Sequence, residues 1–310
     1  MLYQSAFVWN VPQGGAPVHD EEKNVKAIST GSEPVALTAM EQLEAHELRL
    51  FHDKYAFSLL TPEMKFFVAL CRFKWFRNWI ISTSEKAMPG AYAGILCRKL
   101  YFDRKAQANA SAVSAMIDIG AGYDSRSLRL CSKCNVPFYE LDYPETMKKK
   151  EAMIKRAAPS LSERIRFVGI DLDKEKIGEN RVLRAELLKS DGPRFFFLEA
   201  VTPYLTKEGI EELFQFLGDA PKGSFLAFTY IDQAFIDGTD LMHWDAVYKK
   251  YVKNKVWKFG LTKESAATFL AGYGWTLLED ITADEVASKE ILRKRNLATS
   301  KVERFVFAQK

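Results

Sequence analysis

Short apolar runs alternate with helical stretches between Ser114 and Thr229, and this alternation constrains the fold more than any other feature of the chain. The apolar runs are Met116–Ile119, Pro137–Leu141, Ile165–Val168, Phe195–Leu198 and Ser224–Thr229. The stretches between them that favour helices are Ser125–Cys131, Glu145–Ala158, Val182–Lys189 and Lys207–Leu217. Strands that are apolar almost throughout are typical of a parallel sheet covered by helices on both faces. With two further strands at Trp275–Leu278 and Arg304–Phe307, the sequence predicts an open, seven-stranded, mostly parallel α/β sheet.

Three regions are expected along the chain. Residues 1–33 are polar and rich in glycine and proline, which predicts an irregular N-terminal arm. Residues 34–110 have a helical pattern and predict a cap or lid, with helices over Thr38–Leu50 and Pro62–Ile81. Residues 111–310 carry the alternating pattern and predict the ligand-binding sheet domain.

Composition excludes several classes of protein. With 47% hydrophobic and 27% charged residues, the 310-residue chain is neither disordered nor fibrous. A net charge of +4 is too small for a dedicated nucleic-acid binder. Charged residues interrupt the most apolar stretch, Lys65–Ile81, so it predicts no membrane span. We therefore expect a soluble, cytoplasmic protein with neither nucleic acid nor membrane as a partner.

The cysteines do not predict a disulfide framework or a metal site. The chain has four, at Cys71, Cys97, Cys131 and Cys134, which is too few for a secreted scaffold. Cys131 and Cys134 form a CxxC pair, but no second pair or nearby histidine completes four zinc ligands. We interpret these cysteines as structural and expect no metal.

The first predicted strand runs directly into a glycine turn, Gly120-Ala-Gly122. Glycines after a strand allow a tight turn and let a ligand approach the backbone, so Gly120 and Gly122 are candidate binding residues. A dinucleotide fingerprint would place a third glycine where this chain has Ser125. Asp118 before the turn suits a cationic ligand without phosphates. The turn therefore favours S-adenosylmethionine over a nicotinamide or flavin cofactor, and a turn without any ligand remains the alternative.

Four successive predicted strands end in an acidic residue: Asp118, Asp142, Asp171 and Glu199. The carboxyl ends of parallel strands meet at one edge of a sheet, where ligands of such folds bind. Asp142 follows Gly120 by 22 residues, close to the spacing at which an acid binds a ribose diol. Any one of these acids alone is typical of a helix cap or a turn. Together they predict an acidic rim around a ligand with a sulfonium, an ammonium and a ribose.

These residues together resemble the leucine carboxyl methyltransferase family, a branch of the class I S-adenosylmethionine-dependent methyltransferases that includes bacterial methyltransferases of polyketide acids. The matching segments are Gly120–Arg126 with Arg129-Leu130, Tyr139–Pro144 with Lys148, Asp171-Leu172, Glu199–Leu205 and, more faintly, Phe51–Ala56. The resemblance implies a Rossmann-like fold with a helical N-terminal cap and an S-adenosylmethionine-dependent methyltransferase activity.

The resemblance also implies roles for individual residues in binding S-adenosylmethionine. Asp142 would bind the ribose, Asp171 and Leu172 the adenine, and Glu199 the methionine end, beside Gly120. A basic residue upstream, Arg98, would bind the cofactor carboxylate. Eukaryotic members carry a lysine in the early helix, and its absence near Glu41-Gln42 argues against a protein phosphatase as substrate.

Methyl transfer from a sulfonium is an in-line displacement, so the protein mainly aligns the reactants and excludes water. A carboxylate acceptor is ionised at neutral pH and requires no base, only a group that orients it. Tyr204 and Arg126 are the candidates for this catalytic role. A phenol would require a base, and no histidine lies near the predicted rim in the sequence; the four are His19, His46, His52 and His243.

We therefore expect O-methylation of the carboxylate of a small, partly apolar or aromatic acid by a monomer or homodimer. O-methylation of a phenol or another hydroxyl of a natural product is the alternative, and a non-catalytic cofactor-binding module is a third possibility. Thr202-Pro-Tyr204 lacks the Asn/Asp-Pro-Pro motif typical of base methylation. Bases interleaved with aromatics at Arg72–Trp79, Tyr248–Tyr251 and Lys255–Lys258 indicate either amphipathic helices or a lid over the acceptor. If they form a lid, Trp75 and Trp79 are expected to affect the KM of the acceptor.

Overall fold

The computed structural model describes residues 33–172, 174–187 and 191–310. The irregular arm predicted over residues 1–33 lies outside the described residues except for Glu33, which is helical. Across these three ranges no helix is both long enough and apolar enough to cross a bilayer.

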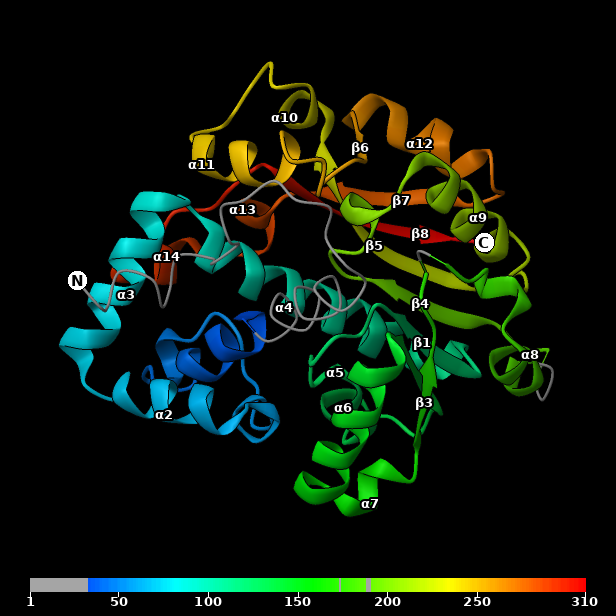
Figure 1. The fold of residues 1–310 in the computed structure, drawn as a ribbon, viewed down its shortest axis with the longest axis horizontal. Helices are drawn as coiled ribbons and strands as arrows, with labels where there is room; N and C mark the ends of the chain where they lie inside the picture. The colour runs from blue at the N-terminus through cyan, green and yellow to red at the C-terminus, as the bar shows by residue number, and fades with distance from the viewer. Residues whose placement is uncertain (1–32, 173, 188–190) are drawn as a thin grey trace.

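A single mixed sheet forms the centre of the molecule (Figure 1), with strands in the order β3-β2-β1-β4-β5-β8-β7. The strands are β1 Ala115–Ile119, β2 Phe138–Asp142, β3 Ile165–Gly169, β4 Arg194–Leu198, β5 Phe225–Asp232, β7 Thr276–Ile281 and β8 Glu303–Gln309. Only β8 runs antiparallel to its neighbours. All seven predicted strands are therefore confirmed. A two-residue strand, β6 at Gly260–Leu261, also pairs with the end of β5 and was not predicted.

Both faces of the sheet are buried, which explains why the strands are apolar almost throughout. In β4, Phe195 and Phe197 belong to the core on one face, and Phe196 and Leu198 belong to the core on the other. Such alternation places each successive side chain on the opposite face. The all-apolar run Phe195–Leu198 is thus the signature of a strand without a solvent-exposed face.

Helices on the two faces come from different parts of the chain. One face packs against α4 Ala91–Asn109, α5 Arg126–Cys131 and α6 Pro144–Ala157. The other packs against α8 Arg181–Leu187, α9 Lys207–Gly218 and α12 Lys263–Ala271. The remaining helical segments are α7 Pro159–Ser162, α10 Gln233–Asp237, α11 Asp245–Val247, α13 Ala283–Val286, α14 Lys289–Arg295, and the single turns η3 Ala110–Ala112, η4 Ile177–Glu179, η5 Thr202–Tyr204 and η6 Tyr248–Val252.

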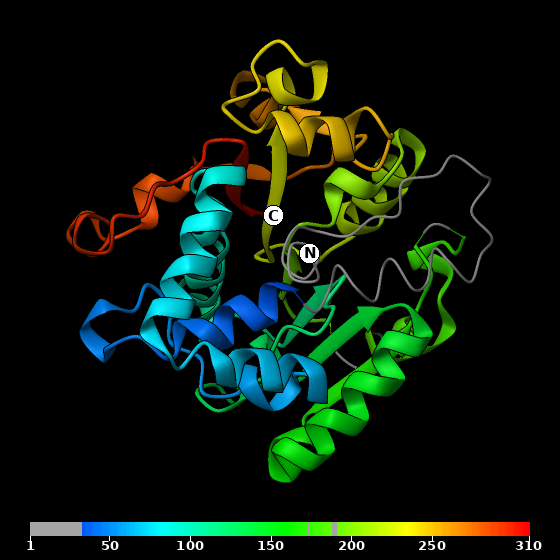
Figure 2. The ribbon, with the colours of Figure 1, turned by 60° about the vertical axis from the view of Figure 1, so that its left-hand side comes forward.

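The segment before the sheet is helical, but its helices are shorter than predicted. They are residues 33–41, η1 His46–Leu48, η2 Ala56–Leu59, α2 Pro62–Leu70, α3 Lys74–Ala87 and then α4. Figure 2 shows the blue and cyan helices as one group beside the sheet, with α6 in green at the lower right of the view.

Two predicted helix lengths are wrong. The helix expected over Thr38–Leu50 ends at residue 41, because the Glu41 carboxylate accepts the Leu50 amide at 2.6 Å and turns the chain back. The helix expected over Pro62–Ile81 breaks after Leu70, where the Arg77 guanidinium donates to the Cys71 carbonyl. In both cases a hydrogen bond between a polar side chain and a backbone group several residues away fixes where the helix ends. The spacing of apolar residues in the sequence does not reveal such hydrogen bonds.

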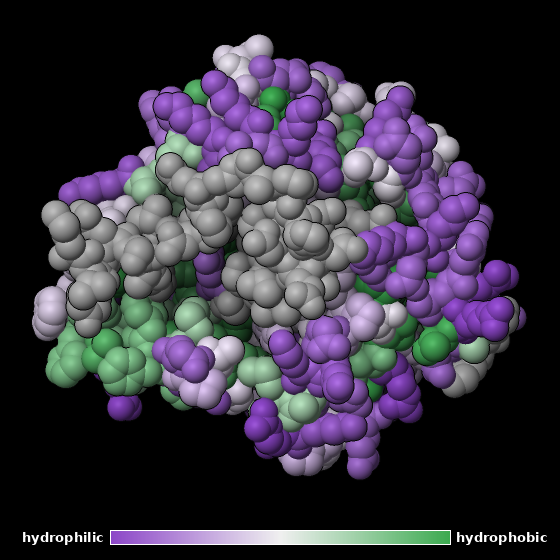
Figure 3. Space-filling model, in the orientation of Figure 1, coloured by the Kyte–Doolittle hydropathy of each residue, from purple (hydrophilic) through white to green (hydrophobic). Residues whose placement is uncertain are grey.

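The surface is not uniformly polar. Figure 3 shows purple, hydrophilic side chains over most of this face and a green, hydrophobic area at the lower left, over α2 and its turn into α3. Exposed large side chains on this part of the chain are Phe57, Phe66, Phe73, Trp75 and Trp79. The helical segment before the sheet therefore carries an unusually apolar outer surface.

Candidate functional site

A pocket of about 550 Å³ opens at the carboxyl ends of β1, β2 and β4. Nine of the ten predicted site residues line it: Arg98, Asp118, Gly120, Gly122, Arg126, Asp142, Leu172, Glu199 and Tyr204. They come from α4, from the ends of parallel strands and from the turns that follow them. The topology therefore brings the predicted residues to one place, as expected for the switch point of an open α/β sheet.

Asp171 is the predicted residue that does not line the pocket. Its carboxylate lies 3.7 Å from the Lys174 ammonium in the turn after β3. Ile170 and Leu172 line the pocket in its place. The carboxylate of the acid between them is paired with Lys174 in the turn. The role predicted for Asp171 at the adenine is not supported by this geometry, whereas the apolar neighbours suit a flat ring.

The glycine turn is locked to its neighbours in the sheet. Gly120 has a φ of +76°, a conformation that favours glycine, and a Cβ there would lie 2.4 Å from a methyl group of Val201. The amides of Gly120 and Ala121 donate to the Leu141 carbonyl. Gly120 thus lets the turn after β1 approach the turn after β4, which brings two walls of the pocket together.

Asp142 closes this turn from the end of β2. One carboxylate oxygen accepts the Gly122 amide and the other accepts the Tyr143 amide, each at 2.7 Å. Burial raises the pKa of Asp142, while the two amide hydrogen bonds favour its ionised form. Its orientation is therefore fixed, and each oxygen has lone pairs left to accept a hydroxyl of a ribose.

Glu199 lies at the centre of a cluster of charges. Arg98 Nε donates to one carboxylate oxygen at 2.9 Å, Lys99 Nζ lies 3.3 Å from the same oxygen, and Arg126 donates to the other. Burial alone would raise the pKa of Glu199, but the three cations together hold it well below its usual range. Glu199 is therefore ionised at neutral pH.

Arg126 is buried and forms ion pairs inside the protein, although its Nε makes no hydrogen bond among the described residues. Its guanidinium donates to Asp118 at 3.0 Å and to Glu199, and it lies over the rings of Phe102 and Phe197. Only 1% of its side chain is exposed. This place does not support the predicted role of orienting the acceptor; Arg126 is a positioning residue that holds Glu199 and Asp118.

Three charged residues of the site were not predicted: Lys99, Asp124 and Glu303. Lys99 forms an ion pair with Asp124 as well as with Glu199. Burial lowers the pKa of Lys99 to about 8. Asp124 lies inside the glycine-turn motif and Lys99 is next to Arg98, so both could have been found. Glu303, at the start of β8, has no such signal.

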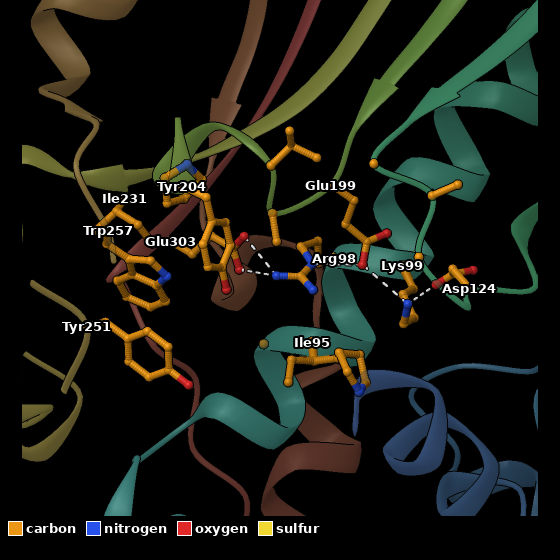
Figure 4. Close-up of a pocket in the computed structure, with 18 of the residues that line it drawn as sticks. Ile95, Arg98, Lys99, Asp124, Glu199, Tyr204, Ile231, Tyr251, Trp257 and Glu303 are labelled. Carbon is orange, nitrogen blue, oxygen red and sulfur yellow. Dashed lines mark hydrogen bonds and ion pairs between the residues drawn. The ribbon is translucent and has the colours of Figure 1, made fainter. Parts of the chain in front are cut away.

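Arg98 divides the pocket into two halves, as Figure 4 shows. Its guanidinium donates to both oxygens of Glu303, at 2.8 and 2.7 Å, and to Glu199 on the other side. Beyond Glu199 lie Lys99 and Asp124. We call this side, with Asp118, Asp142 and the glycine turn, the ionic half.

The opposite side, which we call the aromatic half, is lined by rings. Tyr204 meets Trp257 edge to face with ring centroids 6.5 Å apart, and Trp257 stacks on Tyr251 at 4.9 Å. Trp244 and Ile231 extend the same wall. Burial raises the pKa of Tyr204, so its hydroxyl stays protonated at neutral pH.

The backbone of the aromatic half is irregular. The turn η6 (Tyr248–Val252) is a π-helix, a rare form that often occurs at functional sites. Met242, His243 and Lys255 have positive φ angles although none is glycine. Such strain persists only where surrounding packing enforces it. The segments Tyr248–Tyr251 and Lys255–Lys258, predicted as part of a lid, thus contribute to the pocket wall.

Trp75 and Trp79, predicted as lid residues with them, do not line the pocket. They lie on α3 and are 72% and 51% exposed. The helical segment approaches the pocket only through residues 34 and 35 and through Met88–Ala91 and α4. The geometry of the pocket therefore gives no support to a lid formed by these two tryptophans, and their effect on the KM of the acceptor stays a prediction.

The remaining candidates lie away from the pocket. Cys131 is buried, and the Arg164 guanidinium donates to its carbonyl and to that of Cys134, in agreement with a structural CxxC. His46 and His52 lie against each other, with ring centroids 4.3 Å apart, and no described histidine lines the pocket. Among the described residues no group of His, Cys, Asp and Glu side chains is placed to hold a metal ion.

Comparison with known families decides how this site is classified. The family model of leucine carboxyl methyltransferase matches residues 33–218, more than half of the chain. The chain belongs to the leucine carboxyl methyltransferase family. The match covers α4, the glycine turn and the strand ends that carry the ionic half, and it ends before the segment that carries Tyr251 and Trp257.

Two curated relatives are provisionally named S-adenosyl-L-methionine-dependent methyltransferases. The one from Mycobacteroides abscessus is 27% identical over 197 residues, which cover 62% of this chain and 61% of the relative. The one from Rhodococcus jostii is 24% identical over 202 residues, which cover 62% of this chain and 66% of the relative. The chain therefore spans less than two thirds of the length of the curated relatives it matches.

Two solved structures share the fold. A provisionally named methyltransferase from Thermobifida fusca has a TM-score of 0.56 at 15% identity, covering 83% of this chain and 92% of that chain. A DUF574 family protein from Streptomyces avermitilis has a TM-score of 0.53 at 14% identity, covering 87% of this chain and 99% of that chain. They establish the Rossmann-like class I methyltransferase fold that the sequence predicted.

S-adenosylmethionine is the cofactor of this family of methyltransferases, and the ionic half fits it chemically. Asp118 has a buried carboxylate oxygen, Oδ1, without a hydrogen-bond partner among the described residues. A buried acceptor without a partner is costly, and the ammonium of the cofactor is a suitable donor. Asp142 suits the ribose, and Ile170 and Leu172 suit the adenine. The residues present therefore fit the cofactor.

Proposed function

We propose that this protein is an S-adenosylmethionine-dependent O-methyltransferase that converts the carboxylate of a small, partly apolar or aromatic acid to its methyl ester. The observation that carries the proposal is a buried hydrogen-bond donor in the aromatic half. The indole Nε1 of Trp257 is buried and makes no hydrogen bond of ordinary geometry among the described residues, although it is close enough to the Tyr204 hydroxyl to lower the pKa of that group. Figure 4 shows this nitrogen on the side of the ring that faces Tyr204. An acceptor carboxylate would satisfy both donors.

The charges of the two halves support the same assignment. Six carboxylates of the buried cluster, Asp53, Asp103, Asp118, Asp124, Glu199 and Glu303, face four cations, Arg98, Lys99, Arg126 and Arg129. The excess of negative charge suits a cationic cofactor. At the rim of the aromatic half, the exposed Lys255 and Lys258 line the pocket and suit an anion.

The residues of the chain contribute binding and orientation. When bound, the cofactor supplies an activated methyl group together with its own leaving group. The Tyr204 hydroxyl and the Trp257 N–H are placed to hold the acceptor carboxylate without protonating it. The rings of Tyr251 and Trp257 exclude water from its apolar body. Because a carboxylate is already ionised, the absence of histidine from the described pocket lining does not limit this reaction.

Product chemistry tests the proposal. The purified protein is incubated with methyl-labelled S-adenosylmethionine and a panel of aromatic and aliphatic carboxylic acids, each paired with the phenol of similar shape. We expect a labelled product that releases volatile methanol in alkali, as a methyl ester does. Tyr204→Phe should raise the KM of the acid while leaving that of the cofactor unchanged. A product stable to alkali would indicate a phenol ether, and cofactor binding without turnover would indicate a non-catalytic module.

A further inference from the structure

The outer surface of α2 and α3 concentrates the exposed aromatic side chains of the described chain. Five of the seven large hydrophobic residues that are strongly exposed lie on η2, α2 and α3: Phe57, Phe66, Phe73, Trp75 and Trp79. Their exposed fractions range from 46% to 72%. Apolar areas of this kind on a globular protein mark interaction sites. We call these residues, with Lys65, Arg72 and Lys74, the α2–α3 surface.

The helix α3 is organised to present this surface. Trp75 and Trp79 are four residues apart and therefore lie on one side of the helix. Arg77, Ile80 and Ile81 are its buried residues, and Arg77 forms an ion pair with Glu44 at 2.7 Å. The helix thus has its own buried side, and the tryptophans are not part of it.

Cations outnumber carboxylates in the segment that carries these aromatic residues. Between residues 54 and 86, five cations at positions that are not buried outnumber two carboxylates: Lys54, Lys65, Arg72, Lys74 and Lys86 against Glu63 and Glu85. The Glu85 carboxylate is in addition occupied by the Gly90 amide at 3.0 Å. Tryptophan and phenylalanine beside lysine and arginine are the composition of segments that lie in the interface of an anionic bilayer.

We propose that the α2–α3 surface docks on an anionic lipid bilayer, with its aromatic rings in the interface and its cations at the headgroups. This mode of binding is peripheral and requires no membrane-spanning helix. A second copy of the chain fits less well, because a two-fold interface would pack this surface, with its excess of cations, against an identical surface that also has too few carboxylates to pair with them. Lysine is also depleted from the cores of protein interfaces. The proposal departs from the expectation, made from the sequence, that the protein has no membrane partner.

Docking at this surface would also limit which acids can reach the pocket as acceptors. Helix α3 ends at Ala87, and Met88, Gly90 and Ala91, which follow it, line the pocket. Helix α3 therefore connects the α2–α3 surface, at its N-terminal part, with a wall of the pocket beyond its C-terminal end. If the protein methylates carboxylic acids as proposed above, this arrangement indicates that the acceptors are acids that partition into lipid. Vesicle binding is measured without turnover, so a failure of docking and a failure of methyl transfer are seen separately.

Vesicle sedimentation with the full chain tests the proposal. The vesicles contain phosphatidylcholine alone or equal parts of phosphatidylcholine and phosphatidylglycerol. We expect binding to the anionic vesicles to be at least tenfold stronger, and to fall at least tenfold in a Phe73→Ser, Trp75→Ser variant and in a Lys65→Gln, Arg72→Gln, Lys74→Gln variant. A Val182→Ser, Leu278→Ser variant, which removes exposed apolar residues elsewhere, should bind like the wild type.

Affinity for S-adenosylhomocysteine, the demethylated cofactor, shows whether each variant is folded. If the aromatic variant does not fold, the charge variant decides the question alone. Failure of the wild type to bind anionic vesicles overturns the proposal, and so does an equal loss in the Val182→Ser, Leu278→Ser control. A dimer in solution that dissociates in the aromatic variant, without vesicle binding, would assign the surface to a second copy.

Discussion

At one end of the pocket Glu199 is held by Arg98, Lys99 and Arg126, whereas at the other end Tyr204 lies against the rings of Trp257 and Tyr251. The ionic half is built from the ends of parallel strands and the helix α4, all within the part of the chain that the family model matches. The aromatic half is completed by a segment after β5, outside that match. The comparison teaches that the two walls of the pocket come largely from different parts of the chain, since Tyr204 lies inside the matched range and Tyr251 and Trp257 lie outside it.

The two halves should also respond differently to substitution. In a buried ionic network, loss of one partner leaves the others uncompensated in a medium of low dielectric constant, so a small change has a large effect. A wall of aromatic rings loses only the contacts of the ring that is changed. Substitutions in the ionic half should therefore affect both stability and cofactor binding, and substitutions in the aromatic half should affect only the acceptor.

Glu199→Gln is expected to have the largest effect. Removing its charge leaves three buried cations short of a partner, which costs about 3–5 kcal/mol in the free energy of unfolding, and should abolish measurable binding of S-adenosylhomocysteine. Urea denaturation and calorimetry measure the two effects. Glu303→Gln is the control, because Glu303 pairs only with Arg98 among the cations of the pocket and should cost less. Equal stability of Glu199→Gln and the wild type would contradict the network.

Trp257→Phe tests whether the aromatic half affects the acceptor without affecting the cofactor. The substitution keeps a ring but removes the buried N–H that we assign to the acceptor carboxylate. We expect the KM of the acid to rise about tenfold, the equivalent of about 1.4 kcal/mol for one hydrogen bond, with no change in cofactor affinity. Trp79→Phe is the matched control on the exposed side of α3 and should leave both constants unchanged. A parallel rise in the two KM values would show that the halves are not separate.

Lys99→Met should lose stability like other substitutions in the ionic half, and the smallest expected effect is a difference in pH dependence on top of that loss. Burial lowers the pKa of Lys99 from its ordinary 10.5 to about 8 in the folded protein. Between these values the unfolded chain binds more protons than the folded one, so this lysine makes the free energy of unfolding rise with pH. The variant lacks that contribution. Urea denaturation at several pH values from 8 to 10.5 should give the wild type the more positive slope, and identical slopes would contradict the buried, ion-paired lysine.

The sequence was most informative where backbone geometry demands particular residues. The seven strands were predicted because both faces of the sheet are buried, and Phe195–Leu198 had to be apolar throughout. Gly120, Asp142 and Glu199 were predicted to meet because parallel strands end at one edge. Asp171 was predicted at the adenine, but only its neighbours Ile170 and Leu172 line the pocket, because a motif gives the position of a residue in the chain and not the direction of its side chain.

The aromatic half was less predictable for a physical reason. Rings interleaved with bases have the same pattern whether they line a pocket or cover the outside of a helix, so Trp75 and Trp257 could not be distinguished by composition. Only packing separates them: Trp257 stacks on Tyr251 in the pocket, and Trp75 is 72% exposed. Glu303 reaches Arg98 across 205 positions of the sequence, a contact that follows from the placement of β8.

Calorimetric titration of S-adenosylhomocysteine into the wild type, Asp142→Ala and Trp257→Phe tests the central claim most directly. Asp142 is fixed by the Gly122 and Tyr143 amides in the ionic half, whereas Trp257 belongs to the aromatic half. The account predicts equal affinity for the wild type and Trp257→Phe and a loss of about a hundredfold or more in Asp142→Ala, as expected when charge-assisted hydrogen bonds are removed. Equal binding by all three proteins, or a loss confined to Trp257→Phe, would contradict it.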